Sequence, residues 1–317
     1  MPGDGCTRLV RIPQFGARMA IPILAIVGCA SPAVPSTGPT VASGAATVAA
    51  SAGIASPSVG AASPSVTAGP GPSIRPDELR GTIAFAYDDG LWLSNADGTN
   101  RRQLSHDGGF DPTLSPDGRQ IAYRLLQAAD DGEIWVMDAT GAKRRNLVND
   151  PDFSDWGPAW SPDGSAIAFD SNRQVGLAVW LMRADGTDQR ILTRGHGEYP
   201  SWSPDGTRLA YAGGSYYDIW VVNADGSDDH AITSTPAYDM GPAWSPDGAW
   251  IAYHTQVDAW PAVGESGMGD EMEDAFPAWS PDGRFLMWAR HGELVVARPD
   301  GSWMIDIGPC NFPSWVP

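Results

Sequence analysis

The sequence has few basic residues and only one lysine. Across its 317 residues, 20 Lys and Arg stand against 38 Asp and Glu, which gives a formal net charge of -18, and Lys143 is the single lysine. A chain of this charge is repelled by the phosphates of nucleic acids. Nucleic-acid binding is therefore excluded as a leading function.

Cysteine and long apolar runs are also scarce. The three cysteines, Cys6, Cys29 and Cys310, are too few for a disulfide framework. The longest apolar stretch, Met19 to Ala30, is too short to span a bilayer as a mature helix. Neither a disulfide-stapled fold nor an integral membrane protein is expected.

The N-terminus instead has the pattern of an export signal. Arg8, Arg11 and Arg18 precede the apolar stretch, and Ile26-Val27-Gly28-Cys29 resembles the lipobox of bacterial lipoproteins. This resemblance implies that residues 1–28 are a signal peptide and that Cys29 is acylated. The chain would then be anchored by lipid alone, facing the periplasm or the cell exterior. Ordinary cleavage near Ala30, or no export, is the alternative.

The next segment has almost no means of forming a core. Residues 30–73 are Ala, Ser, Pro, Gly, Val and Thr almost throughout, without charge or aromatic rings. Such a composition buries too little apolar surface to offset its ordering entropy. Residues 29–76 are predicted to be a disordered tether.

From Gly81 onward the chain repeats. Ser-Pro-Asp-Gly begins at 115, 161, 203, 245 and 280, usually after Trp and before a β-rich run such as Ile167-Ala168-Phe169. A second strand follows, as in "DIWVVNADG" (218–226), and then a shorter third one. Units of about 42 residues with four short strands bury their faces only by stacking radially.

Residues 77–317 are therefore predicted to form an all-β, six-bladed β-propeller of four-stranded antiparallel blades. The first unit lacks its inner strand, and the chain ends in a spare "PSW" within 311–317, so the C-terminal strand is expected to complete the first blade. The fifth blade is degenerate, with "DAWPAVG" (258–264) where a regular strand would stand.

The W-S-P-D-G turns and the I-W-x-x-N-A-D-G strands resemble those of the TolB-type, WD-repeat-like propellers. The resemblance covers about three quarters of the chain and implies a cell-envelope module that binds partner proteins. TolB itself has an α/β domain before its propeller, whereas this chain has a tether and a lipobox. The chain is therefore not expected to be TolB.

The two repeated turns are expected on one face of the ring. In Ser-Pro-Asp-Gly, Pro presets φ, Asp bonds its own backbone and Gly takes the positive φ. Asn-x-Asp-Gly also resembles part of a calcium loop, but the remaining ligands are missing. No metal or cofactor is predicted, and the variable loops of the opposite face are the expected binding surface.

That face carries acidic residues beside aromatic ones or Met, just before the inner-strand proline. Placed at equivalent points of the ring, they would form an acidic rim that favours a basic partner. The alternative is that the acids solvate loops and the aromatics pack between blades. The candidate binding residues are Phe110, Asp111, Asp155, Trp156, Glu198, Tyr199, Tyr216, Tyr217, Asp239, Met240, Asp274 and Phe276.

The function predicted is a membrane-tethered, monomeric envelope module that binds a protein, peptide or glycan. No catalytic residue is assigned, since Gly-x-Ser-x-Gly is absent and the ring uses the chain to its end. The alternative is an envelope enzyme of the propeller lyase or dehydrogenase type, with His106, His196 and His254 as candidate metal ligands. A purely structural role also stays open.

Overall fold

A computed structural model of the chain describes residues 6–12, 23–27, 78–88, 90–126, 132–174, 176–215, 217–256, 276–290 and 292–317. The described residues form β-strands and turns and contain no α-helix. Accordingly, this part of the chain offers no helix with the length and hydrophobicity that crossing a membrane requires. The tether and Cys29 lie outside the described residues, so the tether stays a prediction.

The strands form six four-stranded sheets. Blade one contains β24 (Asn311–Val316), β3 (Thr82–Tyr87), β4 (Gly90–Asn95) and β5 (Arg102–Gln103). Blade two contains β6 (Phe110–Leu114), β7 (Gln120–Leu126), β8 (Gly132–Asp138) and β9 (Arg145–Asn146). Blade three contains β10 (Asp155–Trp160), β11 (Ala166–Gln174), β12 (Gly176–Arg183) and β13 (Arg190–Ile191).

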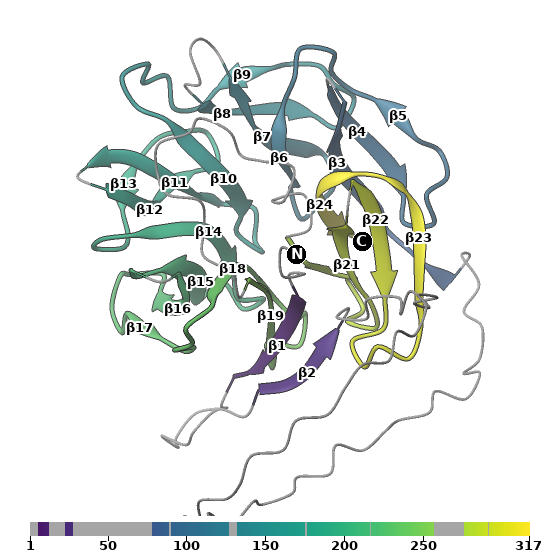
Figure 1. Ribbon diagram of the computed structural model, residues 1–317. Coiled ribbons are helices and arrows are strands. Elements are labelled where there is room, and N and C mark those ends of the chain that lie inside the picture. Colours follow the sequence, from purple (N-terminus) through teal and green to yellow (C-terminus); the bar gives the residue numbers. More distant parts are fainter. Residues whose placement is uncertain are drawn as a thin grey trace, which may run out of the picture.

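The other three sheets complete the ring, in which the first strands β6, β10, β14 and β18 lie nearest the centre (Figure 1). Blade four contains β14 (Gly197–Trp202), β15 (Arg208–Gly213), β16 (Asp218–Asn223) and β17 (His230–Ala231). Blade five contains β18 (Tyr238–Trp244), β19 (Trp250–Gln256), β1 (Cys6–Arg11) and β2 (Ile23–Val27). Blade six contains β20 (Ala278–Trp279), β21 (Leu286–Arg290), β22 (Glu293–Ala297) and β23 (Met304–Pro309).

The core is divided among the six interfaces between neighbouring blades. Each interface holds one cluster of buried side chains, as where Ile167 and Phe169 of β11 meet Ile134 and Val136 of β8. Both faces of a blade are thus covered by its neighbours, which explains why the second strands read as nearly continuous apolar runs. The six-bladed, all-β prediction is confirmed.

The Ser-Pro-Asp-Gly segments are tight turns, as predicted. In the fourth blade the Gly206 amide donates to the Ser203 carbonyl at 2.9 Å, and the Ser203 hydroxyl donates to Asp205 at 2.6 Å. Asp205 also accepts the Thr207 amide at 3.0 Å, and the Ser203 hydroxyl bond is the main cause of its lowered pKa. The aspartate of this turn thus accepts its hydrogen bonds from residues of the same turn.

The C-terminal strand closes the ring. β24 pairs antiparallel with β3, with Trp315 opposite Ile83 and Val316 opposite Thr82. The Trp315 indole donates to the Arg80 carbonyl at 2.8 Å. The predicted closure of the first blade by the C-terminal strand is confirmed.

The fifth blade is completed by the N-terminus. β1 pairs with β19 over six residues, from Cys6 opposite Thr255 to Arg11 opposite Trp250, and β2 pairs with β1. In Figure 1 these two purple strands continue the sheet that β18 and β19 begin. Residues assigned above to the signal peptide thus form the two outer strands of this blade, and the degenerate segment 258–264 lies outside the described residues.

Candidate functional site

The residue before each inner-strand proline has a left-handed backbone. All six blades share this feature, at Asp111 (φ 51°), Gly157 (φ 52°), Tyr199 (φ 55°), Gly241 (φ 58°), Phe276 (φ 70°) and Phe312 (φ 51°). A left-handed conformation costs a non-glycine residue roughly 1–2 kcal/mol. Four blades bear this cost, and five inner strands have a register shift at this point. Such strain concentrates at functional positions.

Three of these residues meet as aromatic rings. The ring centroids of Tyr199 and Phe276 lie 5.1 Å apart in an edge-on arrangement, and those of Phe276 and Phe312 lie 4.9 Å apart. Gly241, between the blades of Tyr199 and Phe276, leaves room for this contact, since a Cβ there would come within 3.4 Å of the Phe276 ring. We call Tyr199, Phe276 and Phe312 the aromatic plug.

Cavities lie on both sides of the plug residues. The channel cavity, about 560 Å³, runs from the pre-proline residues to the Ser-Pro-Asp-Gly prolines and is lined mainly by Pro and Trp. The acidic cavity, about 160 Å³, lies toward the variable loops. Its lining residues are Asp111, Arg124, Trp156, Asp170, Leu177, Glu198, Tyr199 and Phe312.

Asp111 forms the blade-two side of the acidic cavity. Its Oδ2 lies 3.2 Å from Nε of Arg124, and the Arg124 guanidinium carbon lies 4.7 Å from the centre of the Phe110 ring. The Gly157 amide also donates to Asp111. Burial raises the pKa of Asp111, and Arg124 opposes that rise. One cation and one amide thus hold this carboxylate.

Asp170 and Glu198 form the opposite side. Asp170 is 2 % exposed, and its Oδ1 accepts the Tyr199 amide at 3.1 Å. Glu198 is 9 % exposed and accepts the Tyr217 hydroxyl at 2.9 Å. Burial raises the pKa of both carboxyls, and the charges of Glu198 and Asp111 raise the pKa of Asp170 further.

The cavity therefore concentrates negative charge. Among the described residues, three carboxyl groups line it and Arg124 is the single basic lining residue. A space of this size accepts a few waters or one small cationic head group, and such a group would relieve the repulsion among the carboxylates. The geometry suits recognition of a basic side chain.

Replacing Asp170 with asparagine is expected to stabilise the protein in a pH-dependent way. The raised pKa means that the folded chain holds this proton more tightly than the unfolded chain. Stability is therefore lost as pH rises from about 4 toward the raised pKa. Asparagine does not titrate and keeps an acceptor for the Tyr199 amide. The melting temperature of Asp170→Asn should exceed that of wild type at about pH 8, and the two should converge near pH 4. A constant difference across this range would contradict the expectation.

The acidic residues do not stand at equivalent points, which corrects the expectation of a regular rim. Asp111 is itself the left-handed residue of its strand. Glu198 lies one residue before the left-handed residue of its strand, and Asp155 and Asp239 lie two residues before theirs. The register shift at the left-handed residue breaks the simple alternation of side chains along the strand. Of the predicted acidic residues that the structure describes, Asp111 and Glu198 line the acidic cavity, and Asp155 and Asp239 do not.

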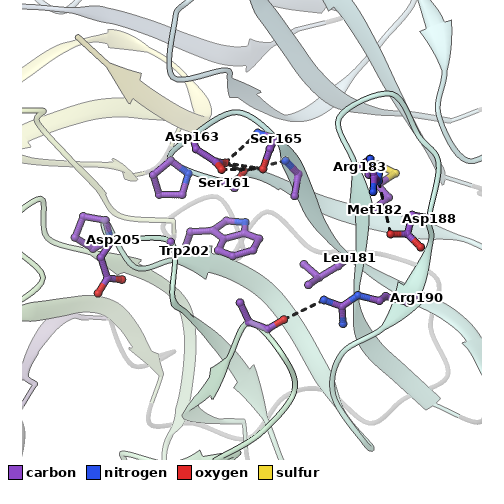
Figure 2. A pocket seen from close by; sticks show the side chains of 15 residues that line it. Ser161, Asp163, Ser165, Leu181, Met182, Arg183, Asp188, Arg190, Trp202 and Asp205 are labelled. Atoms are coloured by element: carbon purple, nitrogen blue, oxygen red, sulfur yellow. Dashed lines mark hydrogen bonds and ion pairs between the residues drawn. The ribbon is translucent and has the colours of Figure 1, made fainter.

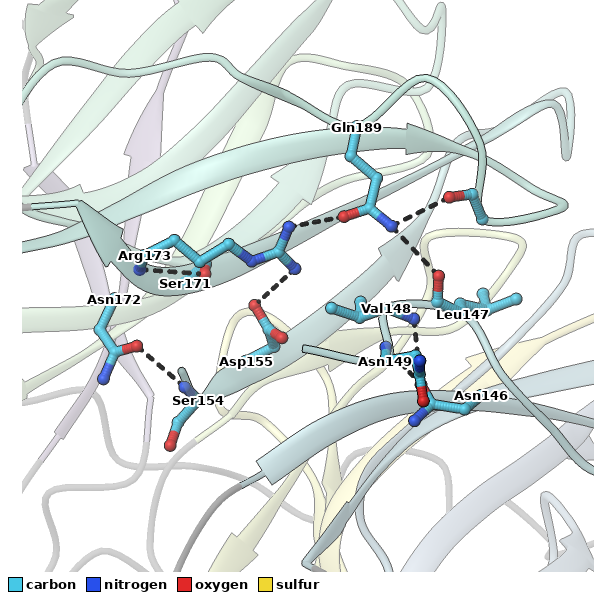
Figure 3. A network of polar contacts seen from close by, with 11 residues as sticks. Asn146, Leu147, Val148, Asn149, Ser154, Asp155, Ser171, Asn172, Arg173 and Gln189 are labelled. Atoms are coloured by element: carbon cyan, nitrogen blue, oxygen red, sulfur yellow. Dashed lines mark hydrogen bonds and ion pairs between the residues drawn. The ribbon is translucent and has the colours of Figure 1, made fainter. Parts of the chain in front are cut away.

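Asp155 belongs to a structural network between blades two and three (Figure 3). It is fully buried, and its Oδ1 accepts the Arg173 guanidinium at 3.0 Å. Arg173 also donates to Gln189 at 2.5 Å, and Gln189 donates to the Leu147 carbonyl at 3.1 Å. Burial raises the pKa of Asp155 to about 6. This side chain is committed to the blade interface.

The remaining predicted binding residues lie in different environments. Asp239 is fully buried, accepting the Thr235 hydroxyl at 3.3 Å, and Met240 is 6 % exposed, so neither lies on the surface. Trp156 lines the acidic cavity, and Tyr217 supplies the bond to Glu198. Tyr216 and Asp274 lie outside the described residues.

Sequence reasoning missed Arg124, Asp170 and Phe312. A signal existed for the first two, in the strand that pairs with the inner strand of each blade (β3, β7, β11, β15, β19 and β21). The residue after the aromatic of that strand is Ala86, Ala212 and Ala289 in three blades, but Arg124, Asp170 and His254 in the others. Two of these three departures from the repeat, Arg124 and Asp170, line the acidic cavity. Phe312 was recognisable as the pre-proline residue of the closing strand.

A third cavity, of about 490 Å³, opens between blades three and four on the face of the regular turns (Figure 2). Its polar lining is already used: Asp163 accepts the Ser161 hydroxyl at 2.6 Å, and Arg190 donates to the Ala224 carbonyl at 3.1 Å. The Arg183–Asp188 pair, at 3.7 Å, is solvent-exposed.

The histidines give no support to a metal site. His254 is buried on β19, while His106 and His196 are exposed. Among the described residues, no three His, Cys, Asp or Glu side chains are arranged to hold a metal ion.

No protein-family model matches the chain. Among solved structures, the chain is similar to TolB from Acinetobacter baumannii, at 19% identity and a TM-score of 0.61 over 76% of this chain and 67% of that one. It is also similar to a putative TolB from Agrobacterium tumefaciens, at 18% identity and a TM-score of 0.53 over 76% and 88%. A chain of a nidogen/laminin complex matches at 11% identity and a TM-score of 0.56 over 75% and 99%. These likenesses confirm a TolB-like propeller fold.

Proposed function

We propose that this chain is a lipid-anchored module of the bacterial cell envelope that binds a partner protein through its variable-loop face. In this proposal a basic side chain of the partner enters the acidic cavity, and the aromatic plug supplies apolar contact beside it. The observation that carries the proposal is the excess of buried carboxylate around one small cavity. A protein bears such repulsion where a cationic group relieves it.

The fold supports the same class of function. Two of the similar structures are TolB proteins and one comes from a nidogen/laminin complex. Fold alone does not assign function, so the cavity carries the argument.

A capture experiment tests the binding site. The full chain, immobilised, is exposed to a bacterial envelope extract, and retained proteins are quantified by mass spectrometry. Glu198→Gln keeps an acceptor for Tyr217 but removes one charge, so it should lower retention of a specific partner by about tenfold. Asp205→Asn, an acid on the opposite face, is the matched control and should retain the partner at the wild-type level. Equal retention by both variants would refute the site.

Export and anchoring are tested separately. The intact mass of the membrane-associated protein should correspond to a chain beginning at acylated Cys29. Cys29→Ser should abolish the lipid mass and move the protein into the soluble fraction. A membrane-bound Cys29→Ser protein with the same mass shift would overturn the assignment of the anchor.

A further inference from the structure

The edge of β19 is shaped to receive an extended strand. β1 pairs with it along six residues, and the Ile12 amide continues the ladder by donating to the Ala249 carbonyl at 2.8 Å. Apart from these N-terminal residues, blade five has only β18 and β19 among the described residues. The strand that fills this edge thus comes from about 240 residues away in the sequence.

The side chains of β1 show what the edge selects. Leu9 is buried against Trp279 and Trp288 at the interface with blade six. Val10 and Ile12 are buried at the interface with blade four. Aliphatic residues at these three positions therefore complete two of the six interface clusters.

The same strand carries two arginines. Arg8 stands opposite Tyr253 in the pairing of β1 with β19. Burial and the charge of the buried Asp239 raise the pKa of the Tyr253 hydroxyl, and the charge of Arg8 lowers it. The Arg11 guanidinium carbon lies 5.9 Å from the centre of the Trp250 ring. A cation is thus accommodated at each position, one at the Tyr253 hydroxyl and one over the Trp250 ring.

Among the described residues, only β18 and β1 pair with β19, so removal of residues 1–28 would leave the β1 edge open. The remaining chain would carry 37 acidic and 17 basic residues, because one Asp and three Arg leave the totals of 38 and 20. An unpaired edge with apolar pockets on both faces is a template for strand addition. The negative charge of the remaining chain favours a basic strand.

We infer that the β19 edge is a second docking site, at which the processed protein takes up an extended segment of a partner protein with the pattern basic, aliphatic, aliphatic, basic, aliphatic. In the unprocessed chain, Arg8 to Ile12 hold the place of that segment. The inference rests on the proposed export, and the site lies on blade five, separate from the acidic cavity.

The test uses two forms of the protein and one peptide. The peptide covers residues 7–13, blocked at both ends and labelled with a fluorophore. The first form is the protein isolated from bacterial membranes, whose N-terminus is read by mass spectrometry. The second is the full-length chain carrying Leu9→Asp and Val10→Asp, in which its own strand cannot be seated.

Binding is measured by fluorescence anisotropy, and folding by circular dichroism. Both forms should bind the peptide, while the unprocessed wild-type chain, whose edge is filled, should not. A peptide with both arginines changed to glutamine should bind at least about tenfold more weakly. A peptide carrying Leu9→Asp and Val10→Asp should not bind.

The outcomes separate the two proposals. A membrane form that begins at Cys29 but does not bind the peptide overturns the docking site and leaves export standing. A membrane form that retains residues 1–28 overturns export, and the Leu9→Asp, Val10→Asp chain then decides the docking site by binding or not binding. If that chain is unfolded, peptide-induced recovery of its β-sheet signal supports the site, and no recovery refutes it.

Discussion

Replacing Arg124 with methionine is expected to lower the free energy of unfolding by about 3–5 kcal/mol near neutral pH. Arg124 is 6 % exposed and pairs with Asp111 at 3.2 Å. In the part of the chain that the structure describes, it is also the single basic residue lining the cavity that Asp170 and Glu198 share. Methionine retains most of the packing volume, so the loss reports charge rather than a void. Removing one partner leaves the buried carboxylates uncompensated.

The loss should depend on pH. Burial raises the pKa values of the cavity carboxyls, so these groups take up protons more readily than ordinary carboxyls as the pH falls, and the destabilisation should be smaller at lower pH. Urea unfolding followed by tryptophan fluorescence at about pH 8 and about pH 5 measures both values.

Two further variants isolate the pair. Adding Asp111→Asn to Arg124→Met should recover part of the lost stability, because one uncompensated charge is removed. Arg119→Met, at a side chain 84% exposed, should change stability by less than about 0.5 kcal/mol. An Arg124→Met loss as small as that of Arg119→Met, or one that does not change with pH, would contradict the role given to this cation.

The parts of the fold that follow from local chemistry could be predicted from the sequence. Each Ser-Pro-Asp-Gly turn is stabilised by hydrogen bonds between residues close in sequence, such as those of Ser203 and Asp205. The turn therefore forms without contacts from distant parts of the chain. The apolar run at Ile167 to Phe169 falls within β11, and the spare "PSW" at the C-terminus falls within β24. Repetition of these signals was enough for the architecture and its closure.

The composition of the site was less predictable, because it depends on which way a side chain faces. The left-handed residue in each inner strand shifts the register, so residues on either side of it do not continue one simple alternation. Asp155 and Glu198 read alike in sequence, yet one joins Arg173 in the blade interface and the other lines the acidic cavity. The pairing of β1 with β19 had no local signature at all.

Replacing Trp315 with alanine is expected to cost about 3–5 kcal/mol, the range for a buried large aromatic side chain. Trp315 is 8 % exposed, packs with Ile83 and Phe285 between blades six and one, and donates to the Arg80 carbonyl at 2.8 Å. It lies on β24, the closing strand, at the position that pairs with Ile83 of β3.

Trp202 is the matched control, because it occupies the same point of the repeat and donates to the Ala159 carbonyl at 3.2 Å. Its strand, β14, is followed directly by β15 and remains bound to the fold by the chain on both sides. Hydrogen exchange should therefore show loss of amide protection along β24 and at the edge of β3 in Trp315→Ala, but only local change in Trp202→Ala. If β24 stays protected in Trp315→Ala while stability falls equally in both variants, Trp315 acts only through its packing. If protection is lost, closure of the ring by β24 depends on this one side chain.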